Sequence, residues 1–312
     1  MNRRSFIQKS LAGVAVANMP ASILYACSNV KPVGIGICDW NLGKSADPSA
    51  IPMAAKAGLE AIQVSVGTSP ENMPLREAAV RKQYLELGKQ HNIAFSCVAA
   101  GSILNRIPLA TEPQSAIYVV DALEAAKALG STNILTAFFS NGDLLEKDAS
   151  GNYINISKGK FAEYKWKDKD IERVIAVMKQ IVPRAEDLGV IIGLENTLTA
   201  DQNLQIINEI GSPMVQIYYD IANTWGNGYD VPGEIRKIGN HRMCEVHIKN
   251  SGSRLIYGDE GKVNMQACAD ALHDIGYNKW LILETSGRPD KFDEETNANI
   301  EFTRRVFIDG KG

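Results

Sequence analysis

Four residues with metal-binding side chains stand at the ends of apolar runs in the second half of the chain. They are Glu195, Asp220, His247 and Glu284. A carboxylate in such a place costs desolvation energy unless it is paired or bound to a cation. Three oxygen ligands and one imidazole, with no thiolate, suit Mn²⁺ or Mg²⁺ and also admit Zn²⁺ or Co²⁺. The sequence predicts a site for one divalent metal ion, with Mn²⁺ favoured.

Each of these residues also has a structural explanation when it is taken singly. Asp220 could cap a helix, and His247 could be a hydrogen-bonded core histidine. Either glutamate could pair with Lys249 or Arg288. The recurrence of such a residue at the end of four successive apolar runs favours the metal site, provided that the runs lie side by side.

The elements that carry these residues follow a regular alternation. Short, apolar, β-branched runs alternate with longer segments of helical periodicity. The predicted strands are 33–38, 61–66, 93–98, 133–138, 190–195, 215–220, 244–249 and 280–284. Predicted helices between them include 75–90, 114–129, 170–188 and 265–275, and several are followed by Gly, a common stop signal.

Eight strand–helix units in about 280 residues have the size and order of a (β/α)8 barrel. We therefore predict an α/β protein with a single-domain TIM barrel over residues 31–312. A doubly wound open sheet is the alternative, but no GxGxxG pattern follows the first predicted strand. In a barrel, the carboxyl ends of the strands form the active site, so the four residues are expected to meet at one mouth.

The motifs around these residues resemble those of a known family. They are Leu194-Glu195-Asn196, Tyr219-Asp220-Ile221-Ala222-Asn223, Val246-His247-Ile248-Lys249-Asn250, Gly258-Asp259-Glu260-Gly261 and Leu283-Glu284-Thr285. They are similar to motifs of the xylose isomerase-like TIM barrel superfamily. Within it the match is to the sugar isomerase/epimerase branch, with ketose 3-epimerases, hydroxypyruvate isomerase and inosose dehydratase. The resemblance implies that the four residues bind one divalent metal, and that Glu195 and Glu284 are also the catalytic acid and base.

Two positions depart from the family pattern. Many members have His three residues after the metal-binding Asp, where this chain has Asn223. Ketose epimerases place Arg six residues after the metal-binding His, where this chain has Ser253 followed by Arg254. These departures weigh against a specific assignment to ketose epimerisation. The nuclease relative endonuclease IV needs further histidines that this sequence does not supply.

The resemblance implies a divalent-metal-dependent sugar isomerase or epimerase that transfers a proton next to a carbonyl through an enediolate. The same residues would also serve aldose–ketose isomerisation or loss of a β-hydroxyl. A sugar lyase or dehydratase acting on a keto-sugar or keto-glycoside is therefore the first alternative. A non-catalytic, sugar-binding envelope lipoprotein is the alternative from another class.

Substrate contacts are predicted from position along the chain. The predicted substrate-binding residues are Trp40, Asn196, Asn223, Lys249, Arg254 and Arg288. An aromatic ring such as that of Trp40 can stack on the apolar face of a sugar. Lys249 either polarises a substrate oxygen or balances the carboxylates.

Composition limits the classes of partner. The chain has 312 residues, of which 45% are hydrophobic and 22% charged, which excludes disorder, collagen and coiled coil. A net charge of −3 lacks the electrostatic footprint of a nucleic-acid binder. We expect a small carbohydrate as substrate and no nucleic acid as partner, and a homo-oligomer remains open.

Residues 1–27 have the features of an export leader. Arg3 and Arg4, then Phe6 and a short apolar stretch, resemble a twin-arginine signal. Residues 24–27 are similar to a lipobox, although Tyr25 departs from the usual small residue. The sequence predicts export to the periplasm, either free or as a lipoprotein with Cys27 as its only membrane anchor. A cytosolic protein with a basic start is the alternative.

Overall fold

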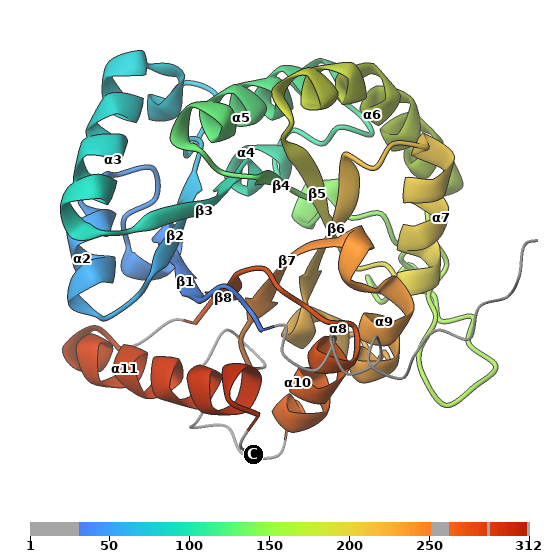
Figure 1. Ribbon diagram of the computed structural model, residues 1–312. Helices are drawn as coiled ribbons and strands as arrows, with labels where there is room; N and C mark the ends of the chain where they lie inside the picture. Colours follow the sequence, from blue (N-terminus) through green and yellow to red (C-terminus); the bar gives the residue numbers. More distant parts are fainter. Residues whose placement is uncertain (1–30, 251–261, 286–287, 311–312) are drawn as a thin grey trace, which may run out of the picture.

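Each of the eight predicted apolar runs forms a parallel strand. The strands are β1 (Ile35–Cys38), β2 (Ala61–Ser65), β3 (Ala94–Ala99), β4 (Asn133–Ala137), β5 (Ile191–Glu195), β6 (Val215–Asp220), β7 (Met243–Ile248) and β8 (Leu281–Leu283). Each strand pairs with the next along the chain and β8 pairs with β1, so the sheet closes into a barrel (Figure 1). The computed structural model describes residues 31–250, 262–285 and 288–310. Within them the predicted single-domain TIM barrel is confirmed.

Helices surround the barrel in the order expected from the alternation (Figure 1). They are α2 (Ala50–Lys56), α3 (Ala78–His91), α4 (Gly101–Leu104), α5 (Ala116–Leu129), α6 (Asp168–Leu188), α7 (Ala200–Ile210), α8 (Ile221–Gly226), α9 (Val231–Ile238), α10 (Met265–Asp274) and α11 (Phe292–Thr303), which is followed by a π-helical turn at Arg304–Ile308. The helix predicted from residue 75 begins three residues later because Pro74–Arg76 form a 3-10 turn. Gly130 and Gly189 end α5 and α6 with φ values of 78° and 66°, as the stop signal predicts.

The core has two parts. Most buried aliphatic side chains lie between the strands and the helices that cover them. A smaller cluster fills part of the barrel interior: Cys97, Ala99, Leu135, Ala137, Tyr218 and Cys244. Gln63, Glu245 and His247 are also completely buried. Because burying polar groups is favourable only when they are hydrogen-bonded, these three residues require partners supplied by other strands.

The long connection between β4 and α6 folds back on itself. Isolated antiparallel bridges join Leu145 to Trp166 and Asn155 to Tyr164. Asp143 anchors its base by accepting hydrogen bonds from Tyr153 Oη at 2.6 Å and Thr197 Oγ1 at 3.0 Å. The segment is therefore an ordered excursion on the carboxyl side of the barrel.

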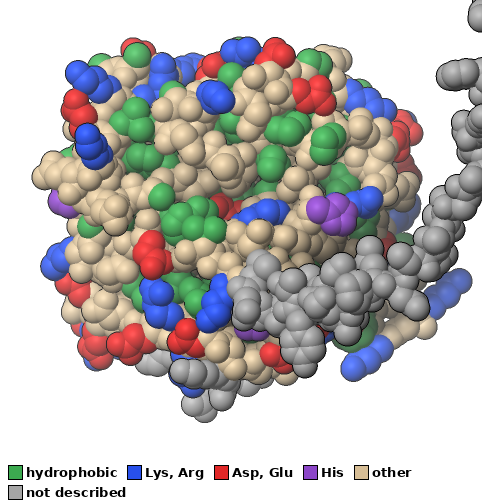
Figure 2. Space-filling view, in the orientation of Figure 1, with side chains coloured by type: hydrophobic (Ala, Val, Ile, Leu, Met, Phe, Trp, Pro, Cys, Tyr) green, Lys and Arg blue, Asp and Glu red, His purple; other side chains and the backbone are tan. Residues whose placement is uncertain are grey.

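Charged side chains of both signs are spread over the face of the molecule seen in Figure 2. Lys and Arg side chains alternate there with Asp and Glu side chains, mostly towards the edge of the view. The described side chains on this face form no broad basic surface of the kind that binds a phosphate backbone.

A buried carboxylate on α9 connects α7 to β6. Glu234 Oε1 accepts a hydrogen bond from Ala200 N at 2.9 Å, and Oε2 accepts one from Tyr219 Oη at 3.3 Å. Burial raises the pKa of Glu234 to about 7, although both hydrogen bonds oppose the shift. The folded protein therefore holds a proton here that an unfolded chain would release.

We expect Glu234→Gln to change the pH dependence of stability. The folded-state pKa of Glu234 lies above its ordinary value of 4.5, so its stabilising contribution is complete below pH 4.5 and is lost as the pH rises through about 7. A shift of this size corresponds to about 3 kcal/mol. Urea unfolding at pH 5 and pH 8 should show that the variant loses less unfolding free energy than the wild type. The exposed Glu209→Gln is the control, and equal pH slopes in wild type and Glu234→Gln would contradict the prediction.

Candidate metal and active site

The four predicted metal ligands lie together at the carboxyl end of the barrel. Glu195 and Asp220 are the last residues of β5 and β6, His247 is the penultimate residue of β7, and Glu284 follows β8 directly. Parallel pairing places Asp220 opposite His247. One ligand atom from each of the four residues lies within 4.8 Å of the others. Four consecutive strands thus bring three carboxylates and one imidazole to one point.

The imidazole of His247 faces the carboxylates through one ring nitrogen. Its Nδ1 atom lies 3.1 Å from Glu195 Oε1, 3.4 Å from Glu284 Oε2 and 3.6 Å from Asp220 Oδ2. Its Nε2 atom lies 2.8 Å from Gln63 Oε1. A neutral imidazole that donates through Nε2 presents a lone pair at Nδ1. Four electron-rich atoms that converge in a buried place fit a divalent cation, and the donor set suits Mn²⁺, Mg²⁺, Zn²⁺ or Co²⁺.

Lys249 supplies positive charge beside this group. Its Nζ atom lies 2.8 Å from Asp220 Oδ2 and also pairs with Glu284 Oε2. Burial alone would raise the pKa of Asp220, but Lys249 and His247 outweigh it and hold that pKa below its ordinary value. Burial raises the pKa of Glu284, although His247 and Lys249 both act to lower it. The position of Lys249 favours the charge-balancing role of the two that the sequence left open.

A cavity of about 450 Å³ opens at the same end of the barrel. Its lining includes Trp40, Ser102, Asn105, Asn223, Glu195 and Glu284. The indole Nε1 of Trp40 donates a hydrogen bond to Glu284 Oε1 at 3.2 Å. Two predicted substrate-binding residues, Trp40 and Asn223, are therefore brought to the cavity that holds both glutamates. Ser102 and Asn105 follow β3 and were not predicted.

The remaining predicted substrate-binding residues lie elsewhere or outside the described residues. Asn196 exchanges hydrogen bonds with Asn203 and accepts one from Leu198 N, and it does not line this cavity. The exposed guanidinium of Arg288 pairs with Glu295. Arg254 falls in 251–261, outside the part of the chain that is described.

The sequence prediction missed Asp39, which supports the site. Asp39 is completely buried directly after β1. Its carboxylate accepts hydrogen bonds from Ser65 N at 2.7 Å, Ser65 Oγ at 2.7 Å and Ala46 N at 2.9 Å. These bonds fix the loop that carries Trp40, and burial raises the pKa of Asp39 to about 6. The sequence did contain a signal for Asp39. It is an acidic residue directly after the apolar run 33–38, much as Glu284 is an acidic residue at the end of the run 280–284.

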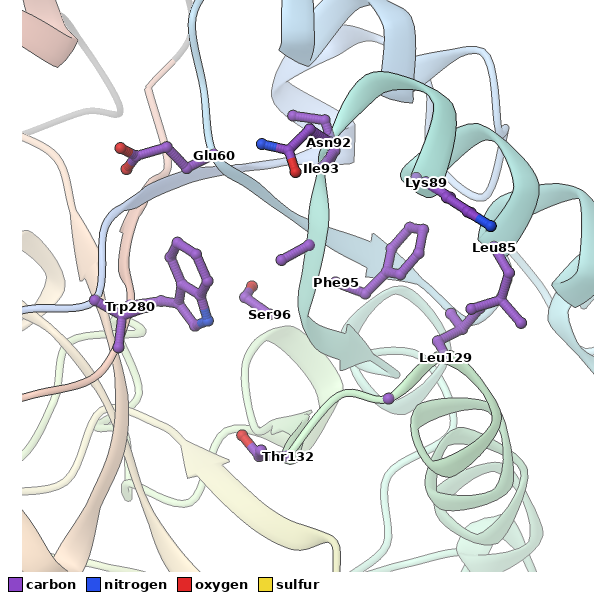
Figure 3. Close-up of a pocket in the computed structure, with 14 residues that line it drawn as sticks. Glu60, Leu85, Lys89, Asn92, Ile93, Phe95, Ser96, Leu129, Thr132 and Trp280 are labelled. Carbon is purple, nitrogen blue, oxygen red and sulfur yellow. The ribbon is translucent and has the colours of Figure 1, made fainter.

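A larger cavity, of about 770 Å³, lies at the opposite end of the barrel (Figure 3). Trp280, Glu60 and Phe95 line it, close to the amino ends of β8, β2 and β3. Within the described residues, the single group of metal-binding side chains lies at the carboxyl end instead. The chemistry is therefore assigned to the smaller cavity.

The comparison with known families decides the assignment. A family model described as xylose isomerase-like TIM barrel matches residues 51–306. The chain belongs to the xylose isomerase-like TIM barrel family. This confirms the resemblance at the level of the family, while the twin-arginine leader stays a prediction.

Similar proteins include several epimerases. The 2-epi-5-epi-valiolone 7-phosphate 2-epimerase of Actinoplanes sp. is 22% identical over 283 residues, which cover 89% of this chain and 96% of the relative. The structure of D-psicose 3-epimerase from Clostridium cellulolyticum H10 with D-tagatose covers 88% of this chain and 100% of its own, with a TM-score of 0.66 and 16% identity. These relatives are consistent with the predicted isomerase.

A further solved structure, of the IOLI protein, is described as having a binding zinc atom. It covers 89% of this chain and 97% of its own, with a TM-score of 0.62 and 15% identity. Zinc in a related barrel agrees with the donor set found here and leaves the identity of the metal open.

Proposed function

We propose that the chain is a divalent-metal-dependent sugar epimerase or isomerase that moves a proton on the carbon next to a carbonyl. One observation carries the proposal: Glu195 and Glu284 meet Asp220 and His247 around one point at the mouth of a sugar-sized cavity. A protein that only binds a metal needs the ligands but does not need two carboxylates that also face the cavity. The epimerases among the relatives support the same reaction class.

The two glutamates are proposed to act on opposite sides of a substrate. Glu195 ends β5 and Glu284 follows β8, and two strands separate them around the barrel. Glu195, Asp220, His247 and Glu284 would hold a divalent cation, which would supply Lewis-acid chemistry that acidifies a C–H bond next to a carbonyl. One glutamate then takes the proton as a general base, and the other returns a proton to the substrate. Trp40 and Lys249 each hold one oxygen of Glu284, so its carboxylate has a fixed orientation.

The proposed substrate is a small carbohydrate that carries no charged group in the part that lies near the metal. Among the described residues that line the 450 Å³ cavity there is no Lys or Arg. Trp40 and Asn223 are proposed to contact the sugar, the first through its ring and the second through its amide. The cavity walls near Leu135 and Phe139 are apolar and suit the C–H faces of a sugar.

Proton NMR in D2O tests this function. The leader-free protein with Mg²⁺ is incubated with a panel of ketoses, aldoses and 3-keto-glycosides. We expect solvent deuterium to enter the carbon next to the carbonyl of at least one substrate. The product then separates epimerisation, isomerisation and elimination. Binding of metal and sugar without exchange across the whole panel would instead support the sugar-binding lipoprotein.

We expect Trp40→Phe to slow the reaction while the protein stays folded. The variant keeps an aromatic ring but loses the hydrogen bond from Nε1 to Glu284 Oε1. A hydrogen bond to a charged group contributes about 1.5–3 kcal/mol, so kcat/KM should fall by roughly tenfold or more. Trp225→Phe is the matched control, because Trp225 lies on α8 and is 38% exposed. An unchanged kcat/KM in Trp40→Phe would remove the proposed orienting role.

We also propose that the protein is exported through its twin-arginine leader. The support is the Arg3-Arg4 pair and the lipobox-like residues up to Cys27, all of which lie outside the described residues. No helix in the described part of the chain has the length and apolar character to span a membrane. Fractionation of cells should find the wild type in the envelope and Arg3→Lys/Arg4→Lys in the cytoplasm. Cys27→Ala then separates a lipid anchor from a free periplasmic protein.

A further inference from the structure

Gln63 on β2 contacts the edge of the His247 ring that points away from the carboxylates. Its Oε1 atom lies 2.8 Å from His247 Nε2, and the two residues are 184 positions apart in the chain. Gln63 is completely buried. A buried amide at the back of a metal-binding imidazole can determine which ring nitrogen carries the proton.

The surroundings of Gln63 fix the orientation of its amide group. Its Oε1 atom accepts from Tyr218 Oη at 2.9 Å and from the Cys38 thiol at 3.4 Å, and its Nε2 atom donates to Cys97 Sγ at 3.7 Å. In this orientation the carbonyl oxygen of Gln63 faces Tyr218, Cys38 and His247, and the amide nitrogen faces Cys97. The carbonyl oxygen of Gln63 is thus held towards His247.

We propose that Gln63 is a positioning residue that keeps the proton of His247 on Nε2 and leaves Nδ1 free to bind the metal. The proposal rests on the metal site described above and does not depend on which reaction the site performs. An acceptor opposite Nε2 favours the tautomer with a proton on that atom. Nδ1 is the nitrogen that lies within 3.6 Å of all three carboxylates, so this tautomer points the lone pair at the ligand set.

Tyr218 on β6, the strand beside β7, supports the same orientation of His247 and Gln63. Its ring lies against the imidazole, with ring centroids 4.5 Å apart. Its hydroxyl lies 2.9 Å from both Gln63 Oε1 and Glu245 Oε2. Tyr218 therefore limits both the rotation of His247 and the movement of the Gln63 amide.

Metal affinity tests the proposal in the absence of substrate. Titration calorimetry with Mn²⁺ compares wild type, Gln63→Met and Gln63→Glu. Gln63→Met has a similar shape but offers only the weakly accepting thioether sulfur, and its dissociation constant for Mn²⁺ should rise by roughly 10- to 100-fold. Gln63→Glu restores an acceptor opposite Nε2 and should bind Mn²⁺ at least as tightly as the wild type.

The tautomer is read directly from the ¹⁵N shifts of the imidazole in Zn²⁺-loaded protein. The chain has four histidines, so the His247 signals are assigned from the spectrum of His247→Asn. We expect a proton on Nε2 in the wild type and in Gln63→Glu, and a loss of this single state in Gln63→Met.

Thr136→Val is the matched control for a general loss of stability. Thr136 is completely buried on β4, and its hydroxyl donates to Gly193 O at 2.8 Å. This control should lower the melting temperature without a change in metal affinity or in the His247 shifts. The proposal is overturned if Gln63→Met binds Mn²⁺ like the wild type, or if Thr136→Val weakens binding as strongly as Gln63→Met. Because no substrate is present, failure of the proposed epimerase reaction would leave these results unchanged.

Discussion

Glu284→Gln is expected to reduce kcat by roughly 10²- to 10⁴-fold, the range that a positioned acid or base contributes. The substitution keeps the size of the side chain and its hydrogen-bonding oxygen but removes the proton-accepting carboxylate. Trp40 Nε1 and Lys249 Nζ both contact Glu284, so the carboxylate is already oriented before substrate binds. The deuterium exchange assay should show exchange reduced by a similar factor. Glu195→Gln should have an effect of the same order.

Loss of a metal ligand must be separated from loss of an acid or base. Asp220→Asn removes a ligand charge from the same group of four, but Asp220 has no proposed role in proton transfer. Saturating Mn²⁺ should therefore restore much of the activity of Asp220→Asn and little of the activity of Glu284→Gln. Equal recovery of the two variants would show that Glu284 acts only as a ligand.

Removal of the divalent metal is expected to abolish turnover and to lower the melting temperature. Three carboxylates converge within 4.8 Å of one another and of His247, and their mutual repulsion is costly in a buried place. A ligand at 100 times its dissociation constant stabilises the folded state by about 2.7 kcal/mol. For a domain of this size that corresponds to a shift of several degrees in the melting temperature, roughly 2–4 °C for each kcal/mol.

Thermal unfolding with EDTA, followed by addition of Mn²⁺, Mg²⁺, Zn²⁺ or Co²⁺, measures this effect and ranks the metals. The metal that restores both turnover and the melting temperature at the lowest concentration is the best candidate for the native ion. His247→Asn should show little rise in melting temperature with any of them, because the imidazole ligand is lost. Unchanged turnover and melting in the presence of EDTA would contradict the assignment of a metal site.

The sequence by itself determined the alternation of strands and helices and the four residues at the carboxyl ends of the strands. These features are local: burial on both faces selects continuous apolar runs, and helices repeat with their own period. Eight such runs joined by helices predict parallel strands, and in a parallel sheet the carboxyl ends of neighbouring strands lie at the same edge. Glu195, Asp220, His247 and Glu284 could therefore be named before their distances were known.

The tertiary structure decided which groups surround these four residues. The contact between Gln63 and His247 joins β2 to β7 across the barrel interior, and Asp39 is held by Ser65 on the neighbouring strand. The tertiary structure also directs the Asn196 side chain towards Asn203. Hydrogen bonds between residues so far apart depend on barrel closure and on side-chain orientation, which local hydrophobic patterns do not encode. The sequence shows where a polar residue stands on a strand, but its hydrogen-bond partner is determined only when the sheet closes.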